Sequence, residues 1–217
     1  LFHPRLQVRM RAEERVNPYA SAAPLDDELH FVTARFRAGI SADYRDLRVV
    51  LEVQDARNFG TAAPGTDPGS SFGVHQAYGE VRHGGSYLRL GRQEIAYGDE
   101  RLVGPLDWAS AARAFDAVRG HYQHGIVGLD LSAALVAQQS AIVDPGPPPS
   151  TRRSGGDYFG AAQLSVAAFP ALSIELLYLY RRDRPDAASP TRDRRISAGS
   201  LRVSSTQVHG FRYVAEA

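Results

Sequence analysis

The chain has 217 residues, a hydrophobic fraction of 43% and no cysteine, which excludes disulfides, thiolate metal sites and cysteine nucleophiles and allows one all-β domain or a small pair. No run of about 18 apolar residues occurs, so a transmembrane helix is excluded, whereas a transmembrane barrel is not, because its alternating strands have the mean hydropathy of a soluble protein. Positive and negative side chains nearly balance, to a net charge of +1, so nucleic-acid binding is not supported. The positive side chains are arginines, which favour bidentate contacts with carboxylate or phosphate.

The first part of the chain alternates apolar and charged residues with the period of two that β-strands require. Residues 5–13 place Leu6, Val8 and Met10 on one face and arginines on the other. The same pattern predicts strands over residues 28–41 and from Leu47 onward. Proline marks a loop at residues 17–26, and a brief turn is predicted at residues 42–44.

The rest of the chain continues this pattern, and its connections alternate between long and short. Further strands are predicted at residues 74–82, 87–97, 115–123, 127–139, 158–168, 172–181, 196–203 and 211–216. Long loops at residues 58–71, 98–112, 144–156 and 182–192 alternate with turns at 83–85, 123–125 and 169–170. Ten connections thus join eleven strands. An up-and-down transmembrane barrel has this rhythm, with short periplasmic turns and long outer loops, and it places residues 98–112 on the outer side.

A soluble β-sandwich is the alternative, since it would bury the apolar faces between two sheets and expose the arginines. Strand length weighs against it, because several segments exceed the usual ~5 to 6 residues and approach the ~9 to 11 of a tilted membrane strand. The sequence therefore predicts an all-β fold, an antiparallel up-and-down transmembrane β-barrel.

Eleven strands is an odd number, whereas single-chain bacterial barrels have even ones. We therefore expect residues 1–217 to be the N-terminal portion of a single barrel domain, present here as an incomplete sheet. An open edge is untenable in lipid, so the isolated chain should not insert stably. Any signal peptide has been removed or lies upstream of Leu1.

Residues 87–119 are predicted as a strand, a loop at residues 98–112 and a second strand, and the loop carries more charge than a simple connection needs. Strict alternation would place Arg92 and Glu94 on the same lipid-facing side as Leu88 and Leu90. Either Gly91 marks a bulge that rotates the strand, or the charged pair belongs to a salt-bridge network above the bilayer. The charges of this loop are interpreted first as a structural network and second as ligand contacts. The residues concerned are Arg92, Glu94, Asp99, Arg101, Asp107, Trp108 and Asp116.

Three further features of the sequence bear on chemistry. Trp108 is interpreted as a loop-packing or interface anchor in preference to a sugar-stacking platform. Carboxylates at Asp99, Glu100, Asp107 and Asp116 would allow glycoside cleavage, but nearby arginines keep them ionised, which suits structural pairs better than a general acid. The histidines lack ligand spacing. We expect no enzyme activity, no catalytic residue, no cofactor and no metal.

The sequence GRQEIAYGDERLVGPLDW followed by AFDAVR resembles the alginate-export family of bacterial outer-membrane barrels, as does VQDARNFG with the later HQAY. Ala111, Ala112 and Arg113 depart mildly from the family pattern, because more polar residues are expected in that part of the loop. The matching residues are Arg92, Gln93, Tyr97, Gly98, Asp99, Arg101, Leu102, Gly104, Trp108, Phe115 and Asp116, with Gln54, Asp55, Ala56, Arg57, Gln76, Ala77 and Tyr78.

The resemblance implies a bacterial outer-membrane barrel of about eighteen strands that passes an anionic polysaccharide such as alginate. The partners that the resemblance implies are this polymer and outer-membrane lipid, and periplasmic export components are a further candidate. Guanidinium groups would hold carboxylates while acidic residues moderate the attraction, and a general anion-selective porin is the alternative within this fold. The predicted lumen arginines are Arg9, Arg35, Arg37, Arg48, Arg89 and Arg119, and the moderating acids are Glu13, Glu52, Glu80 and Asp130.

Overall fold

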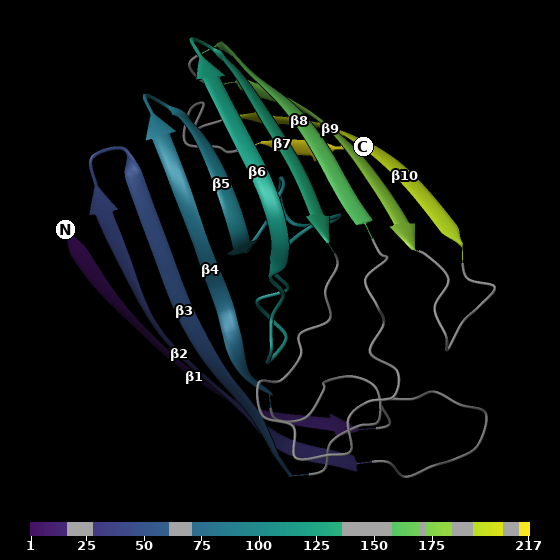
Figure 1. The fold of residues 1–217 in the computed structure, drawn as a ribbon. Coiled ribbons are helices and arrows are strands. Elements are labelled where there is room, and N and C mark those ends of the chain that lie inside the picture. Colours follow the sequence, from purple (N-terminus) through teal and green to yellow (C-terminus); the bar gives the residue numbers. More distant parts are fainter. Residues whose placement is uncertain (17–27, 61–70, 136–157, 170–171, 184–192, 206–212) are drawn as a thin grey trace.

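The computed structural model describes residues 1–16, 28–60, 71–135, 158–169, 172–183, 193–205 and 213–217. In this part of the chain, eleven antiparallel strands form one sheet in which each strand pairs with its neighbours in sequence (Figure 1). The strands are β1 (Phe2–Val16), β2 (Glu28–Tyr44), β3 (Leu47–Gly60), β4 (Ser71–His83), β5 (Ser86–Gln93), β6 (Phe115–His124), β7 (Val127–Leu135), β8 (Tyr158–Phe169), β9 (Leu172–Asp183), β10 (Arg194–Ser205) and β11 (Val214–Glu216).

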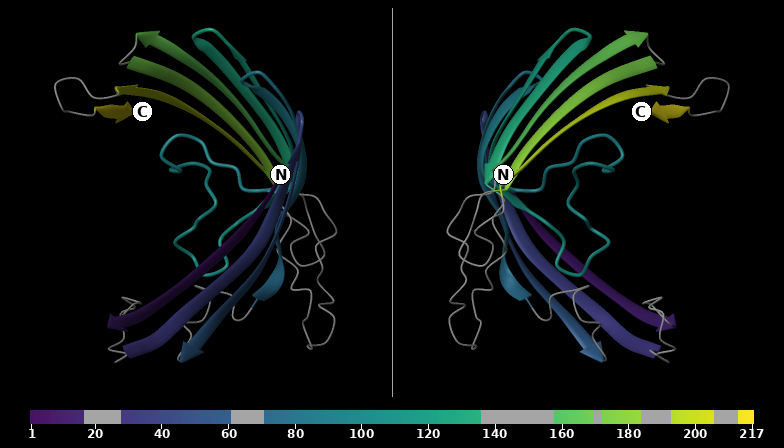
Figure 2. Two further views of the ribbon diagram at one scale, coloured as in Figure 1. Left: turned by 90° about the vertical axis from the view of Figure 1, so that its left-hand side faces the viewer. Right: turned by 90° about the vertical axis from the view of Figure 1, so that its right-hand side faces the viewer.

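The sheet curves into an open trough, with β1 and β11 at its two free edges (Figure 2). The connection between β5 and β6 enters the hollow of this trough. The predicted all-β, up-and-down antiparallel sheet of eleven strands is confirmed. The sandwich alternative is wrong, because the described strands belong to one continuous sheet and their apolar faces are not packed against a second one.

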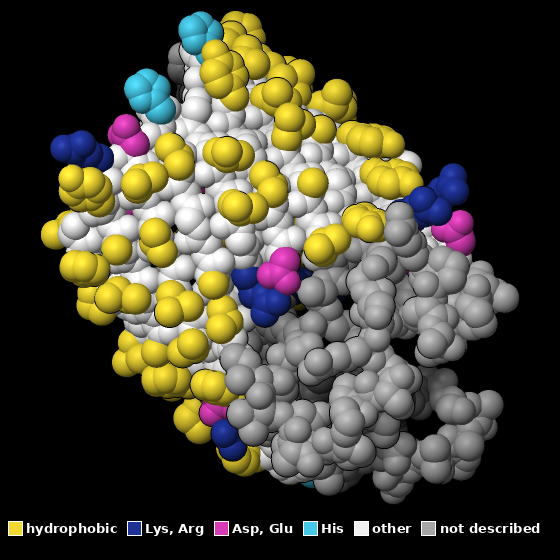
Figure 3. Space-filling model, viewed as in Figure 1, with side chains coloured by type: hydrophobic (Ala, Val, Ile, Leu, Met, Phe, Trp, Pro, Cys, Tyr) yellow, Lys and Arg dark blue, Asp and Glu magenta, His cyan; other side chains and the backbone are white. Residues whose placement is uncertain are grey.

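The two faces of the sheet differ in chemistry because side chains alternate along each strand. In β7, Leu129, Leu131 and Leu135 are exposed on the convex face, whereas Asp130 and Ser132 are buried on the concave face. The same division runs through β1 to β3. Apolar side chains consequently cover the convex face (Figure 3). No helix in the described ranges is long and apolar enough to cross a membrane.

Exposed aromatic side chains mark both ends of the convex face. At the end with the short turns they are Phe2, Tyr44, Tyr122 and Phe169. At the opposite end they are Phe59, Phe72, Tyr158 and Tyr180. Exposed aliphatic residues such as Val49 and Leu51 of β3 occupy the face between the two groups.

Several strand boundaries differ from the prediction. The β2–β3 turn lies at Arg45 and Asp46, because β2 continues to Tyr44. β5 ends at Gln93 and does not reach Tyr97, since the following residues turn into the trough and become buried there. β7 is described to Leu135, and the predicted continuation to residue 139 lies outside the described residues.

A β-bulge lies in the β3–β4 pair, where Glu52 faces Gln76 and Val53 faces Val74. The residue between them, His75, is unpaired in the register, and both His75 and Gln76 are buried. A bulge lets two successive residues of one strand face the same side. It therefore adds a histidine to the concave face.

Candidate functional site: the concave face and its inner loop

The connection between β5 and β6, residues 94–114, is called the inner loop here. It closes on itself through backbone hydrogen bonds from Tyr97 N to Val103 O at 3.2 Å and from Arg113 N to Pro105 O at 2.5 Å. Glu100, Leu106 and Ala112 adopt positive φ angles of 63°, 51° and 55°. Such angles cost of order 1 kcal/mol or more in non-glycine residues and persist only when contacts around them fix the backbone.

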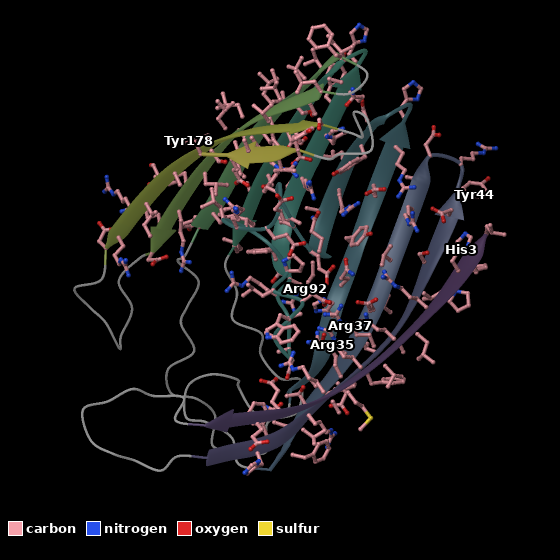
Figure 4. The ribbon with its side chains drawn as sticks, turned by 180° about the vertical axis from the view of Figure 1, so that it is seen from behind. His3, Arg35, Arg37, Tyr44, Arg92 and Tyr178 are labelled. Atoms are coloured by element: carbon pink, nitrogen blue, oxygen red, sulfur yellow. The ribbon has the colours of Figure 1, made fainter. Side chains whose placement is uncertain are left out.

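Arginines of β1 and β2 hold one side of the loop. Arg9 donates to the carbonyl oxygens of Asp107 and, at 2.8 Å, Trp108, and Arg11 donates to Trp108 O at 2.6 Å. Arg35, only 2% exposed, forms an ion pair of 2.8 Å with the Asp107 carboxylate. Figure 4 shows Arg35 and Arg37 together on the concave side of the sheet. The cations of β1 and β2 thus bind the backbone and the carboxylate of one short loop segment.

Gln54 of β3 and Arg37 of β2 continue this polar contact. Gln54 donates to Ala111 O at 2.6 Å and accepts a hydrogen bond from Arg37 Nε at 2.7 Å. Arg37 also lies 3.3 Å from the Glu94 carboxylate and 3.6 Å from that of Asp107. Because both carboxylates lie near Arg37, this side chain connects the entry of the loop to its tip.

The other side of the loop is apolar and packs on β6 to β9. Ile95, Tyr97 and Val103 are almost fully buried in one hydrophobic cluster. The sheet contributes Phe115, Ala117, Ala134, Phe159, Ala161, Leu177 and Leu179 to that cluster. Burial of large apolar side chains stabilises by roughly 1.5–3 kcal/mol each, so this contact anchors the loop independently of the arginines.

Tyr97 adds a polar contact beneath this cluster. Its hydroxyl donates to Asp130 Oδ1 at 2.7 Å and lies 2.9 Å from Ser132 Oγ. Burial raises the pKa of Tyr97 well above its ordinary value, so the phenol keeps its proton and remains a donor. Asp130 also accepts from Arg119 Nε at 3.0 Å.

Two contacts tie the loop to the far strands. Arg202 of β10 forms an ion pair of 2.8 Å with Asp99 and one of 3.2 Å with Glu175 of β9. Arg101 lies 3.9 Å from Glu216 of β11. The inner loop therefore spans the trough from β1 to β11, which places a polypeptide obstruction across the hollow.

Glu94 occupies the point where the chain leaves β5. His75, brought inward by the bulge and completely buried, donates a hydrogen bond from Nε2 to Glu94 Oε1 at 2.7 Å. Burial by itself raises the pKa of Glu94, but the hydrogen bond and charge of His75 and the charge of Arg37 outweigh it and lower the pKa below its ordinary value.

This lowered pKa predicts how loop docking depends on pH. Glu94 stabilises the docked loop fully above its ordinary pKa of about 4.5, and that contribution is lost as pH falls through the lower docked-state pKa. We expect the difference in single-channel conductance between the full-length wild type and Glu94→Gln to be constant above the ordinary pKa of Glu94 and to disappear as pH falls through its lower docked-state pKa. A difference that persists unchanged at the acidic end would contradict this assignment.

The remaining predicted lumen arginines lie nearer the short-turn end. Arg89 pairs with Glu80 at 2.6 Å, Arg119 with Asp130 at 3.0 Å, and Arg48 lies 3.6 Å from Asp43. Arg48 faces Glu80 in the register, Glu80 faces Arg89, and Arg89 faces Arg119. One cross-strand row over β3 to β6 thus carries three cations and one anion. Like charges directly opposite one another are destabilising, so this row has an energetic cost.

A cavity of about 520 Å³ opens beside this row. Its polar lining includes Arg5, Arg48, Arg89, Glu52 and Gln76. Glu52 is buried and 3.5 Å from Gln76 Nε2. The volume of the cavity lies within the ~300–1,000 Å³ usual for ligand sites.

Arg92 and Asp116 lie apart from the rest of the predicted loop network. They face one another across β5 and β6 and form two hydrogen bonds of 2.8 Å. Alternation along β5 places Arg92 on the convex face, with Leu88 and Leu90. Arg92 also donates to Val74 O of β4 at 3.2 Å, beyond Ala77, the last β4 residue that pairs with β5. The register is continuous at Gly91, so the alternative of a bulge there is wrong. Arg92 keeps its place on the convex face, and an ion pair balances its charge.

Gly91 is instead a place of close backbone approach. Its φ is +124°, and a Cβ there would lie 2.3 Å from Ala77 O. We expect Gly91→Ala to destabilise the full-length barrel by about 2–3 kcal/mol in urea unfolding from lipid vesicles. Gly79→Ala is the matched control, because a Cβ at Gly79 meets nothing within 4 Å. Equal stability of the two variants would refute this role.

Sequence reasoning missed several residues of this arrangement. The resemblance includes Gln54 and Tyr97 without giving them a role, and the contacts of Arg11, His75 and Arg202 were not foreseen. One signal was present for the apolar side: residues 176–180 of β9 are continuously apolar, and Leu177 and Leu179 are buried. A strand that is apolar on both faces is covered on both faces.

The model of the protein family described as "Alginate export" matches residues 5–217. The match covers β2 to β11, all of β1 from Arg5 onward, and the whole inner loop. No curated protein matches the chain.

Proposed function

Because the chain belongs to the alginate-export family, a family of outer-membrane export channels, we propose that it forms part of the wall and the constriction of a channel for an anionic polysaccharide. The concave face is then the wall of the aqueous path, and the convex face meets outer-membrane lipid. The polymer class we propose is a polyuronate, with one carboxylate per sugar. The protein acts by passage of the polymer and not by cleavage.

The dimensions of the convex face support the position in a membrane. From Tyr158 to Phe169 the extended chain covers about 36 Å at ~3.3 Å per residue, or about 28 Å along the normal at a tilt of ~40°. This agrees with a hydrocarbon thickness of about 30 Å. The aromatic groups at both ends then coincide with the two interfaces, where such side chains are enriched.

The observation that carries the proposed selectivity is the cross-strand row of Arg48, Glu80, Arg89 and Arg119. Guanidinium groups present paired donors that match a carboxylate and remain charged at any pH reached by the cell. Glu80 and Asp130 are hydrogen-bonded to two of these arginines, which weakens their grip on a passing carboxylate. Conduction requires such moderation, because a polymer bound too tightly would not leave.

The carboxylates considered for catalysis support the same view. Asp99, Asp107 and Asp116 each form an ion pair with a different arginine: Arg202, Arg35 and Arg92. Glycoside cleavage needs two carboxyl groups that flank one bond, whereas each of these carboxylates is engaged by a separate arginine. Their placement suits structural anchoring.

Planar-bilayer recordings of the full-length protein test this function. We expect polyuronate oligomers to interrupt the ionic current and neutral oligosaccharides of the same length to leave it unchanged. A channel that prefers small anions but shows no polyuronate events would favour the general anion-selective porin. A channel without anion preference would refute both.

A further inference from the structure

Trp108 is the single tryptophan of the chain, and it stands at the tip of the inner loop with 72% of its surface exposed. A tryptophan usually contributes to stability by burying its large ring. Here the side chain is largely exposed, while arginines hold the backbone beside it. This combination separates Trp108 from Ile95 and Tyr97, which anchor the same loop by burial.

The peptide groups on both sides of Trp108 are fixed by three arginines. Trp108 O accepts from Arg9 and Arg11 at 2.8 and 2.6 Å, and Ala109 O lies 3.4 Å from Arg35 Nη1. A turn hydrogen bond from Ala109 N to Leu106 O at 2.9 Å closes the tip. The ring is therefore presented by a preorganised backbone, which lowers the entropic cost of binding a ligand on it.

Guanidinium groups also flank the indole. The guanidinium carbon of Arg11 is 4.2 Å from the ring centroid and that of Arg9 is 5.5 Å away. These groups lie over part of the indole, and most of the side chain nevertheless remains exposed. The exposed part of the ring can accept the apolar side of a pyranose, and the cations attract a carboxylate on it.

We propose that Trp108, with Arg9 and Arg11, forms a subsite that stacks one acidic sugar ring of the polymer at the inner-loop tip. This inference rests on the proposed function and adds to it a defined contact point at the constriction. The arginine row on β3 to β6 attracts the polymer by charge. The Trp108 subsite additionally holds a pyranose ring, so it distinguishes an acidic sugar from a small anion.

The test uses the full-length protein in planar bilayers with hexuronate oligomers. We expect Trp108→Ala to shorten the dwell time of oligomer events about five- to tenfold and Trp108→Phe to shorten it less, because a smaller aromatic face remains. Leu106→Ala is the matched control, since it removes exposed apolar surface from the same turn. It should leave the dwell time unchanged.

A second readout keeps the proposal falsifiable if Trp108→Ala disturbs the loop. The difference between the emission spectra of the wild type and Trp108→Phe isolates the fluorescence of this residue. We expect it to change with hexuronate oligomers and not with neutral oligomers. Oligomer events that keep their wild-type dwell time in Trp108→Ala, or a difference spectrum unchanged at saturating hexuronate, would overturn the subsite. Absence of events from the wild type would instead count against the proposed channel function.

Discussion

Asp107→Asn should raise the single-channel conductance of the full-length protein by up to about twofold, because it loosens the tip of the inner loop from Arg35 while the apolar side of the loop stays anchored. Arg35 is almost completely buried and pairs with the Asp107 carboxylate. Loss of that carboxylate leaves a buried cation without its counter-charge. This loss destabilises the docked loop by about 2–3 kcal/mol. The value is low for a buried pair because Asp107 itself is half-exposed and partly screened by water.

The control for this variant is Glu100→Gln in the same loop. It removes the same charge by the same isosteric change, but the Glu100 side chain is exposed. We expect its conductance to match the wild type. If Asp107→Asn and Glu100→Gln behave alike, the loop is not held across the hollow by Arg35.

The second large effect concerns charge selectivity. The double variant Arg89→Gln with Arg119→Gln should abolish most of the preference for anions, because it removes two facing cations and leaves Glu80 and Asp130 in place. In a salt gradient, we expect the reversal potential of the full-length channel to move to that of a non-selective or cation-preferring pore.

Arg45→Gln with Arg57→Gln is the matched control, since it removes two arginines that do not lie on the concave face. Arg45 is in the β2–β3 turn. Arg57 forms an ion pair with Asp55, and both lie on the convex face of β3. The reversal potential should stay at the wild-type value. A double Arg89 and Arg119 variant that remains as anion-selective as this control would show that the row does not set selectivity.

Much of the sheet followed from the sequence because its signals are local. A period of two, proline-containing loops and alternating connection lengths were enough to predict eleven antiparallel strands in order. The concave placement of Arg35, Arg37 and Arg89 also follows from alternation, because each shares its strand face with other polar residues. The polar face of a strand is predictable without knowledge of its distant neighbours.

The partners of these arginines were not predictable, because they come from segments far apart in the chain. Arg9 meets Trp108 across 99 positions, and Arg202 meets Asp99 across 103. The pattern predicts Arg9, Arg35 and Arg37 as lumen cations, and in the structure all three also contact the inner loop. Side-chain periodicity indicates the face of a residue and not what covers that face.

The inner loop also departs from its prediction at its start. Ile95 and Tyr97 have the aromatic and β-branched content of a strand, and the sequence predicts one there. Both side chains are instead buried between the loop and the sheet, in one cluster with Phe115, Phe159 and Leu177. Strand propensity and burial favour the same residue types, so local composition alone does not distinguish them.

We propose that an acidic polymer passes through this channel, and the voltage dependence of polyuronate events tests this passage most directly. In planar bilayers of the full-length protein, a polymer that passes through is driven out faster as the voltage rises, so its dwell time should fall. A polymer that binds at the mouth without passing is pressed against the inner loop, and its dwell time would rise. Falling dwell times are the predicted result, and rising ones would contradict passage.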